Sequence, residues 1–151
     1  MENKTGMIFK KLAYIMNEAK PIGKDNINKQ QGFNFRSIDA VMDNLHPLFA
    51  KNEVIIIPKV LEEKKEERIT KGGGNLIYRV LKMQYNFVAT DGSSVAVEVI
   101  GEGMDSGDKA ANKAMAIALK YALTQMLLLP YDEVDPDGES PLESKPKEEK
   151  Q

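Results

Sequence analysis

The chain has 151 residues, a length that suits one globular domain, and its 42% hydrophobic fraction with 11 glycines excludes disorder throughout. Zero cysteines and one histidine exclude disulfides, thiolate zinc sites and a cysteine nucleophile, and they disfavour a His-based triad or His-rich metal site. The net charge of −2 gives no overall sign of nucleic-acid binding, but the charge is unevenly distributed. No apolar run approaches the roughly 18 residues of a membrane helix. The first residues also lack the apolar stretch of a secretion signal, so we expect a protein of the cytoplasm.

Two helices are expected in the first third of the chain. The first spans about Thr5–Ala19 and ends before Pro21, because its apolar residues recur with the helical period. After a polar segment, Phe33–Arg36 reads as a short extended piece, and Ser37 suits the N-cap of the second helix. The two apolar faces are expected to consist of Ile8, Leu12, Ile15, Met16 and Ala19, and of Ile38, Val41, Met42, Leu45, Leu48 and Phe49.

Three antiparallel strands are expected next. Four consecutive β-branched residues, Val54–Ile57, predict a strand that is covered on both faces. Residues 61–71 are highly charged and would extend this strand beyond the body as a hairpin arm, with the glycines of 72–74 as its turn. A subunit contact at this arm is a hypothesis that rests on its length and charge. The following strands are expected at Asn75–Ala89 and Ser93–Ile100.

The loop between the last two strands follows from their register. A two-residue Asp91-Gly92 turn would place the apolar residues of the two strands on opposite faces. A three-residue loop, Thr90–Gly92, places them on one face and puts Gly92 at the left-handed position that such loops require. The expected pairs are Phe87 with Val95, Tyr85 with Val97, and Met83 with Val99. The opposite face is then solvated or binds a polar partner, and it carries Lys82, Gln84, Asn86, Ser94 and Glu98.

A glycine-rich segment, Gly101–Lys109, precedes the last expected helix. It fails the P-loop pattern because Asp108 separates glycine from lysine and no serine or threonine follows, and it also fails the G-x-G-x-x-G pattern. We favour a tight strand-to-helix connection over a nucleotide site, with Asp105 or Ser106 as the helix cap and Asp108 in the first turn. A one-metal carboxylate site at Glu102, Asp105 and Asp108 stays open, although the spacing does not match an EF-hand.

The last helix is expected to continue to Pro130. Most of its residues are apolar, so we expect it to be buried on nearly all sides, except for one narrow stripe of lysines. Lys109, Lys113 and Lys120 fall within about 40° of one another at about 100° per residue. A solvated helix face is the plain interpretation. A row of phosphate contacts is the functional one, because the lysines are spaced roughly 6 and 10 Å along the axis, on the order of the spacing between nucleotides. Three such contacts bind weakly, so useful affinity would need repeated subunits along one strand.

The C-terminal residues 131–151 differ from the rest of the chain in charge. They hold eight acidic and three basic residues, a net charge of −5, whereas residues 1–130 hold 18 basic and 15 acidic residues, a net charge of +3. Three prolines and few aliphatic residues predict a disordered tail behind a folded domain of residues 1–130. A solubilising end is the plain interpretation of this tail, and an acidic mimic of nucleic acid or a docking peptide is the functional one.

Three segments carry a family resemblance. They are Phe33–Val41 with its aromatic-x-aromatic-Arg-Ser pattern, the Asp91-Gly92 hairpin with the valine-rich strand that follows, and Gly101–Ala122. The third segment is specific, and together they span roughly residues 30–130. The chain resembles the ERF (essential recombination function) family of phage single-strand annealing proteins. It departs from some relatives at the C-terminus, where they carry a further domain and this chain has a short acidic tail.

The resemblance implies a bacteriophage protein of the bacterial host cytoplasm that coats single-stranded DNA and pairs complementary strands in homologous recombination and DNA repair. It implies no enzymatic activity, no ATP and no cofactor. The implied fold is α+β, with a three-stranded antiparallel sheet and β-hairpin packed on a long helix, similar to the Rad-type annealing proteins. Relatives assemble into rings or helical filaments, so we expect a homo-oligomer, with a single-strand-binding protein as a natural partner.

The residues expected to bind DNA are Lys109, Lys113 and Lys120 for phosphates, Arg36 as a further basic candidate, and Tyr85 for base stacking. Phe33 and Phe35 share the stacking interpretation, and packing in the core is the alternative for all three aromatic residues. No catalytic residue and no metal ligand is assigned. Two other functions stay open: a plain single-stranded DNA-binding module without annealing activity, and a structural self-assembling protein. A nuclease has the least support.

Overall fold

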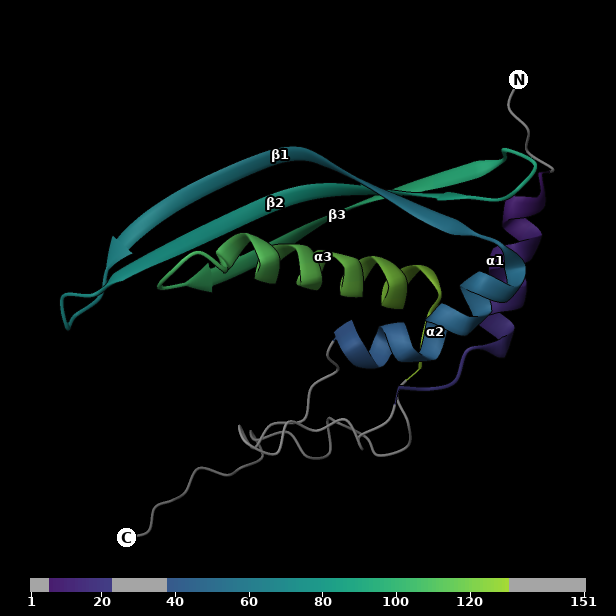
Figure 1. Ribbon diagram of the computed structural model, residues 1–151, viewed down its shortest axis with the longest axis horizontal. Coiled ribbons are helices and arrows are strands. Elements are labelled where there is room, and N and C mark those ends of the chain that lie inside the picture. Colours follow the sequence, from purple (N-terminus) through teal and green to yellow (C-terminus); the bar gives the residue numbers. More distant parts are fainter. Residues whose placement is uncertain (1–5, 23–37, 131–151) are drawn as a thin grey trace, which may run out of the picture.

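The computed structural model describes residues 6–22 and 38–130 of the chain. Within these ranges it is an α+β structure with three helices and a three-stranded antiparallel sheet of order β1-β2-β3 (Figure 1). The elements are α1 (Met7–Glu18), α2 (Ile38–Asn52), β1 (Ile55–Ile69), β2 (Asn75–Val88), β3 (Ser94–Asp105) and α3 (Ala110–Met126). The expected α+β class with a three-stranded antiparallel sheet is thereby confirmed, and the likeness to the Rad-type annealing proteins stays a prediction. No helix in the described residues is long and apolar enough to span a membrane.

Two expectations fall on other parts of the chain. The segment Phe33–Arg36 with the N-cap residue Ser37, and the acidic tail of residues 131–151, lie outside the described residues. The division of the chain into a domain of residues 1–130 and a tail therefore stays a prediction.

A long hairpin formed by β1 and β2 projects beyond the helices as an arm (Figure 1). The antiparallel pairing runs from Ile55 and Val88 to Ile69 and Asn75, with one irregularity near Val60. At the tip, the Thr70 hydroxyl accepts a hydrogen bond of 2.9 Å from the Gly74 amide. An ion pair between Arg79 and Glu63 crosses the two strands. The charged arm expected from residues 61–71 is confirmed, and its role in a subunit contact remains a prediction.

The register of β2 and β3 is the one that a three-residue loop predicts. Phe87 pairs with Val95, Tyr85 with Val97, and Met83 with Val99. The Ala89 amide donates to the Ser93 carbonyl at 3.0 Å, the Gly92 amide donates to the Ala89 carbonyl at 3.0 Å, and Gly92 has a φ of 86°. Because side chains alternate along a strand, the polar set that includes Lys82 and Glu98 lies on the face opposite to these apolar pairs, and this expectation is confirmed.

The expectation that the start of β1 is covered on both faces is wrong. Val54 is buried, but the side chains of Ile55 and Ile57 are 58% and 48% exposed. The physical reason is the position of β1 at the edge of the sheet, with α2 and α3 both on the same side of the sheet (Figure 1). One face of β1 therefore has no covering layer in the described part of the chain.

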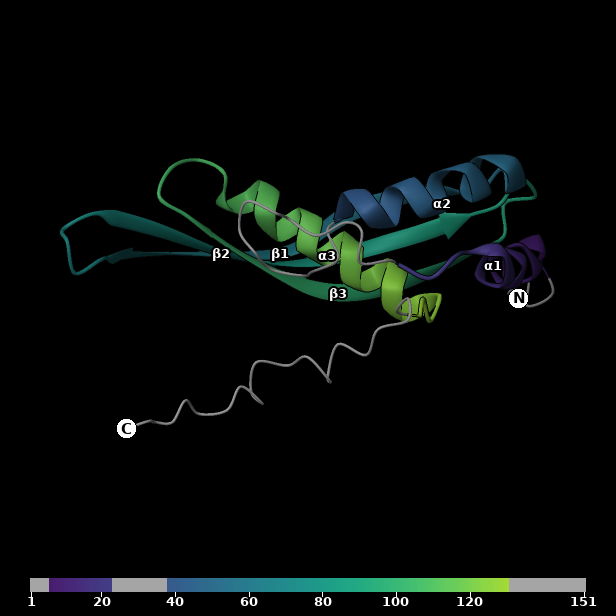
Figure 2. The same ribbon diagram turned by 90° about the horizontal axis from the view of Figure 1, so that it is seen from below.

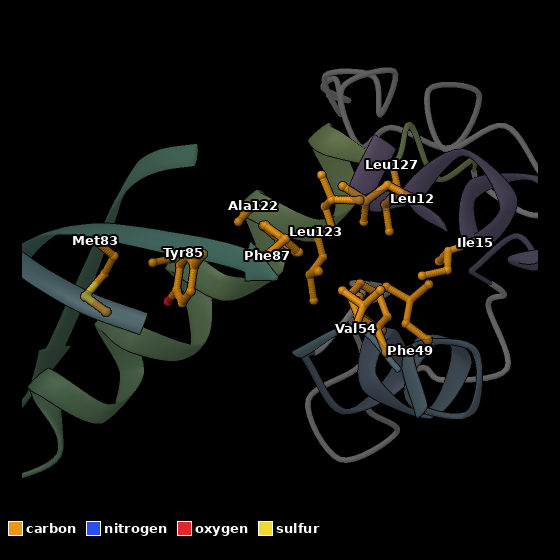
Figure 3. Close-up of a cluster of buried hydrophobic side chains, with 14 of the residues drawn as sticks. Leu12, Ile15, Phe49, Val54, Met83, Tyr85, Phe87, Ala122, Leu123 and Leu127 are labelled. Carbon is orange, nitrogen blue, oxygen red and sulfur yellow. The ribbon is translucent and has the colours of Figure 1, made fainter. Parts of the chain in front are cut away.

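The hydrophobic core lies between the helices and the sheet and takes side chains from α1, α2, β2 and α3 (Figure 3). The rings of Phe49 and Phe87 lie 6.1 Å apart between centroids in this core. Met16 and Met42, expected on the apolar helix faces, are exposed instead. The buried side chains labelled in the close-up include Leu12, Ile15, Phe49, Val54, Phe87, Leu123 and Leu127.

The loop between β2 and β3 caps the N-terminus of α1. The Met7 amide donates to an Asp91 carboxylate oxygen at 3.0 Å, and the Ile8 amide donates to the Ser93 hydroxyl at 2.9 Å. The hydrogen bond from Ser93 and that from the Met7 amide hold the pKa of Asp91 below its usual value. The first turn of α1 thus obtains its hydrogen-bond acceptors from residues more than 80 positions away, which ties the helix to the sheet.

Candidate nucleic-acid interface

A close contact between glycine and alanine residues seats α3 on β3. Ala110, Ala114 and Ala118 are buried along one face of α3, opposite Gly101 and Gly103 of β3. A Cβ atom added to Gly101 would lie 2.2 Å from the Ala114 carbonyl oxygen, and one added to Gly103 would lie 2.3 Å from the Ala110 carbonyl oxygen. The backbones of the helix and the strand therefore touch, and only glycine fits at these two positions.

This contact corrects two expectations. The segment Gly101–Lys109 is not a loop along its whole length, because β3 continues to Asp105 and its glycines face the helix. The helix α3 is not buried nearly all round, since Met115 and Tyr121 are 40% and 43% exposed, and it ends at Met126 rather than at Pro130. Alanine at every fourth residue was a signal for this one-sided packing, because only small side chains allow so close an approach.

Asp105 organises the short connection from β3 to α3. One carboxylate oxygen accepts hydrogen bonds from the amides of Gly107 and Lys109 at 2.8 and 3.3 Å, and the other lies 2.9 Å from the Lys113 ammonium. The expectation that Asp105 or Ser106 is the N-cap residue is wrong. The helix begins at Ala110, and Lys109 is at the N-cap position without a side-chain hydrogen bond. Its first turn holds no acidic residue, so Asp108 lies before the helix.

The carboxylate metal site that the sequence left open gains no support. Residues 6–22 and 38–130 hold no group of three or more side chains of histidine, cysteine, aspartate or glutamate that could bind a metal ion. Of the three candidate ligands, Asp105 already has hydrogen-bond donors at both of its oxygens. Its role is to fix the turn and the Lys113 side chain.

Protonation of Asp105 is expected to loosen this connection in acid. The hydrogen bond from Lys113, followed by those from the amides of Gly107 and Lys109, lowers the pKa of Asp105 to about 2. The unfolded chain titrates near 3.9, so the stabilisation is complete above a pH of about 4 and is lost as the pH falls through about 2. A carboxyl titration by NMR should place the Asp105 midpoint near 2.

The matched substitutions Asp105→Asn and Asp108→Asn separate this effect from a change in net charge. Asp105→Asn should remove the part of the acid unfolding curve that depends on this carboxyl group, and Asp108→Asn should leave that part in place. An Asp105 midpoint near the ordinary value of about 3.9 would contradict the assignment.

An open groove of about 510 Å³ runs along the lysine stripe of α3. The side chains that line it come from three sides: Lys113, Ile117 and Lys120 from α3, Ile38 from α2, and Tyr78, Glu102 and Met104 from the sheet. It therefore combines two ammonium groups and one carboxylate with apolar and aromatic side chains. This combination suits a ligand that carries negative charge next to flat apolar groups, as a nucleic-acid strand does.

The structure brings together two of the five residues expected to bind DNA, Lys113 and Lys120, in this groove. The Lys113 ammonium also donates to the Met104 carbonyl at 3.2 Å, and the Lys120 ammonium lies 5.5 Å from the centroid of the Tyr121 ring. Lys109 is exposed before the first turn of α3. Arg36, like Phe33 and Phe35, lies outside the described residues.

Tyr85 lies in the core and not in the groove (Figure 3). Its side chain is 3% exposed, its hydroxyl donates to the Met115 carbonyl at 3.4 Å, and burial raises its pKa. A nucleobase cannot stack on a ring that is enclosed in this way. The core interpretation of Tyr85 is therefore the one that the structure shows.

Tyr78 is the aromatic residue of the groove that sequence reasoning missed. Seven positions separate it from Tyr85, so the two side chains point to opposite faces of β2. The guanidinium group of Arg68, on the neighbouring strand, lies 4.9 Å from the centroid of the Tyr78 ring. The available signal was the strand alternation, which places Tyr78 outside the apolar set of Leu81, Met83, Tyr85 and Phe87.

One protein family matches this sequence over nearly its whole length. The model of the ERF superfamily matches residues 8–151, which include all the described elements except the first residue of α1. The matched range also contains the three segments that carry the resemblance. No match was found among the curated proteins with which the chain was compared.

Proposed function

The chain belongs to the ERF superfamily, and from this membership we propose that it binds single-stranded DNA and anneals complementary strands in phage recombination, without ATP and as an oligomer. The observation that carries the proposal is the groove in which Lys113 and Lys120 stand on one stripe of α3 beside apolar and aromatic side chains.

The geometry of the groove suits contacts that do not depend on base sequence. Lys113 and Lys120 are seven residues apart on a helix, so their Cα atoms are spaced roughly 10 Å along its axis, a distance that phosphates of an extended strand can match. Contacts to phosphates position a strand without reading its sequence, and they leave base edges open to a complementary strand. Annealing requires no proton transfer, so a non-catalytic protein is sufficient for it.

An oligomer follows from the small number of cationic contacts in each subunit. Few phosphate contacts give a weak and salt-sensitive affinity, whereas many subunits on one strand multiply it through effective concentration. The arm formed by β1 and β2 is the surface that we assign to the subunit contact. It projects from the body (Figure 2). Exposed apolar side chains, including Val60 and Ile69, lie among its charged residues.

A fluorescence annealing assay tests the proposal directly. Two complementary oligonucleotides, one with a fluorophore and one with a quencher, should pair faster with the protein than without it, and addition of ATP should change nothing. Negative-stain images with and without single-stranded DNA should show rings or filaments.

The other outcomes of this assay separate the alternatives. Binding without faster pairing would indicate a plain single-stranded DNA-binding module. Assembly without DNA affinity would indicate a structural protein. Degradation of the oligonucleotides on addition of a divalent metal would revive the nuclease interpretation.

A further inference from the structure

Tyr78 lines the groove and is not part of the hydrophobic core cluster. It pairs with Glu66 of β1 and with Met104 of β3, and it lines the groove together with Lys113 and Lys120. The phosphate contacts of the proposed function use only the two lysines, so they assign no role to the Tyr78 ring.

The surroundings of Tyr78 suit a nucleobase. The Arg68 guanidinium lies 4.9 Å from the centroid of its ring and is also paired with Glu66 at 3.2 Å. Met104 and Ile117 add apolar surface to the same groove. A base offers a flat ring to the aromatic wall, while its own phosphate carries the charge that the nearby cations attract.

We propose that Tyr78 stacks on a nucleobase of the strand whose phosphates contact Lys113 and Lys120. The inference rests on the proposed function and deepens it, because it assigns the residue that contacts bases. Stacking uses the face of a base and not its hydrogen-bonding edge, so it is compatible with pairing to a complementary strand. Every base has such a face, so the contact tolerates any sequence.

The test compares a thymine oligonucleotide with an oligonucleotide of equal length and charge in which abasic sites replace the bases. Tyr78→Ala should lower the affinity for the thymine strand by about 5-fold or more, because base stacking on an aromatic residue is worth roughly that much or more. It should change the affinity for the abasic strand less than 2-fold, since that strand has nothing to stack. Tyr78→Phe should retain the affinity of the wild-type protein for both strands.

A matched control is Tyr14→Ala on α1, another partly exposed tyrosine with a nearby cation, Lys51 at 5.7 Å from its ring centroid. This variant should bind both strands as the wild-type protein does. Equal losses on the two strands for Tyr78→Ala, or no loss on either, would overturn the inference.

A second measurement keeps the test independent of the folding of Tyr78→Ala. Photocrosslinking of the wild-type protein to an oligonucleotide that contains 5-iodouracil should modify the peptide that contains Tyr78, as mass spectrometry can determine. Crosslinks confined to other peptides would contradict the proposal. If the wild-type protein bound neither strand, the proposed function itself would fail, and binding that depends on Lys113 and Lys120 but not on Tyr78 would refute the stacking alone.

Discussion

Replacing Lys113 and Lys120 together by glutamine is expected to weaken the binding of single-stranded DNA about 25-fold at 0.1 M salt. Each phosphate that a lysine neutralises on a single strand contributes about 0.7 to the salt slope, which amounts to about 5-fold per contact at this concentration. The slope of log K against log salt should therefore fall by about 1.4. Fluorescence anisotropy of a labelled oligonucleotide at several salt concentrations measures both quantities.

The control for this prediction removes two charges elsewhere. Lys10 and Lys11 lie on α1, at the end of the molecule away from the arm (Figure 1). Replacing both by glutamine should leave the salt slope within about 0.3 of the wild-type value, a margin well below the 0.7 of one lost contact. An equal loss of affinity in the two double variants would show that net charge alone matters and that the groove is not the binding site.

Substitution of Gly101 by valine is expected to reduce the free energy of unfolding by about 3 kcal/mol. Even the Cβ atom would come within 2.2 Å of the Ala114 carbonyl oxygen and 2.8 Å of the Ala118 nitrogen, so α3 must move away from β3. These are backbone atoms, and they cannot turn aside as a flexible side chain can. Urea denaturation followed by circular dichroism measures the change as a lower midpoint.

Gly72→Val is the matched control for this substitution. Gly72 lies at the tip of the arm and has nothing within 4 Å of an added Cβ atom. The control variant should unfold within about 0.5 kcal/mol of the wild-type protein, as surface substitutions do. If Gly101→Val were as stable as Gly72→Val, the backbone contact between α3 and β3 would not exist.

The lysine double substitution and Gly101→Val both test the position of α3 relative to the sheet. The contact of Gly101 and Gly103 with α3 sets where the helix lies, and Asp105 fixes the turn before it and the Lys113 side chain. Gly101→Val is therefore expected to weaken DNA binding as well as stability, since a displaced helix carries both lysines away from Tyr78. The lysine substitutions, in contrast, should reduce the stability much less, because they remove surface interactions such as the exposed ion pair of Lys113 with Asp105 and create no clash with the backbone.

The sequence by itself determined the features that depend on local periodicity. The alternation of apolar residues and one glycine at a left-handed position were enough to predict the pairing of Phe87 with Val95 and of Met83 with Val99. Charge and length were enough to predict the arm, and the segment from Gly101 to Ala122 was enough to indicate the family that matches residues 8–151. Each of these signals lies within a short stretch of chain.

Only the tertiary structure decided which side chains are covered and which meet in the groove. The sequence could not show that Tyr85 is buried and that Tyr78, which is half-buried, lines the groove, because burial depends on which helix packs on which face of β2. The sequence suggested that Gly101 and Gly103 belong to a loop, whereas the structure places them in β3 against the backbone of α3. Ile55 and Ile57 looked like core residues until β1 proved to be an edge strand. Burial and site geometry depend on residues distant in the chain, whereas helical period and strand alternation depend on neighbours alone.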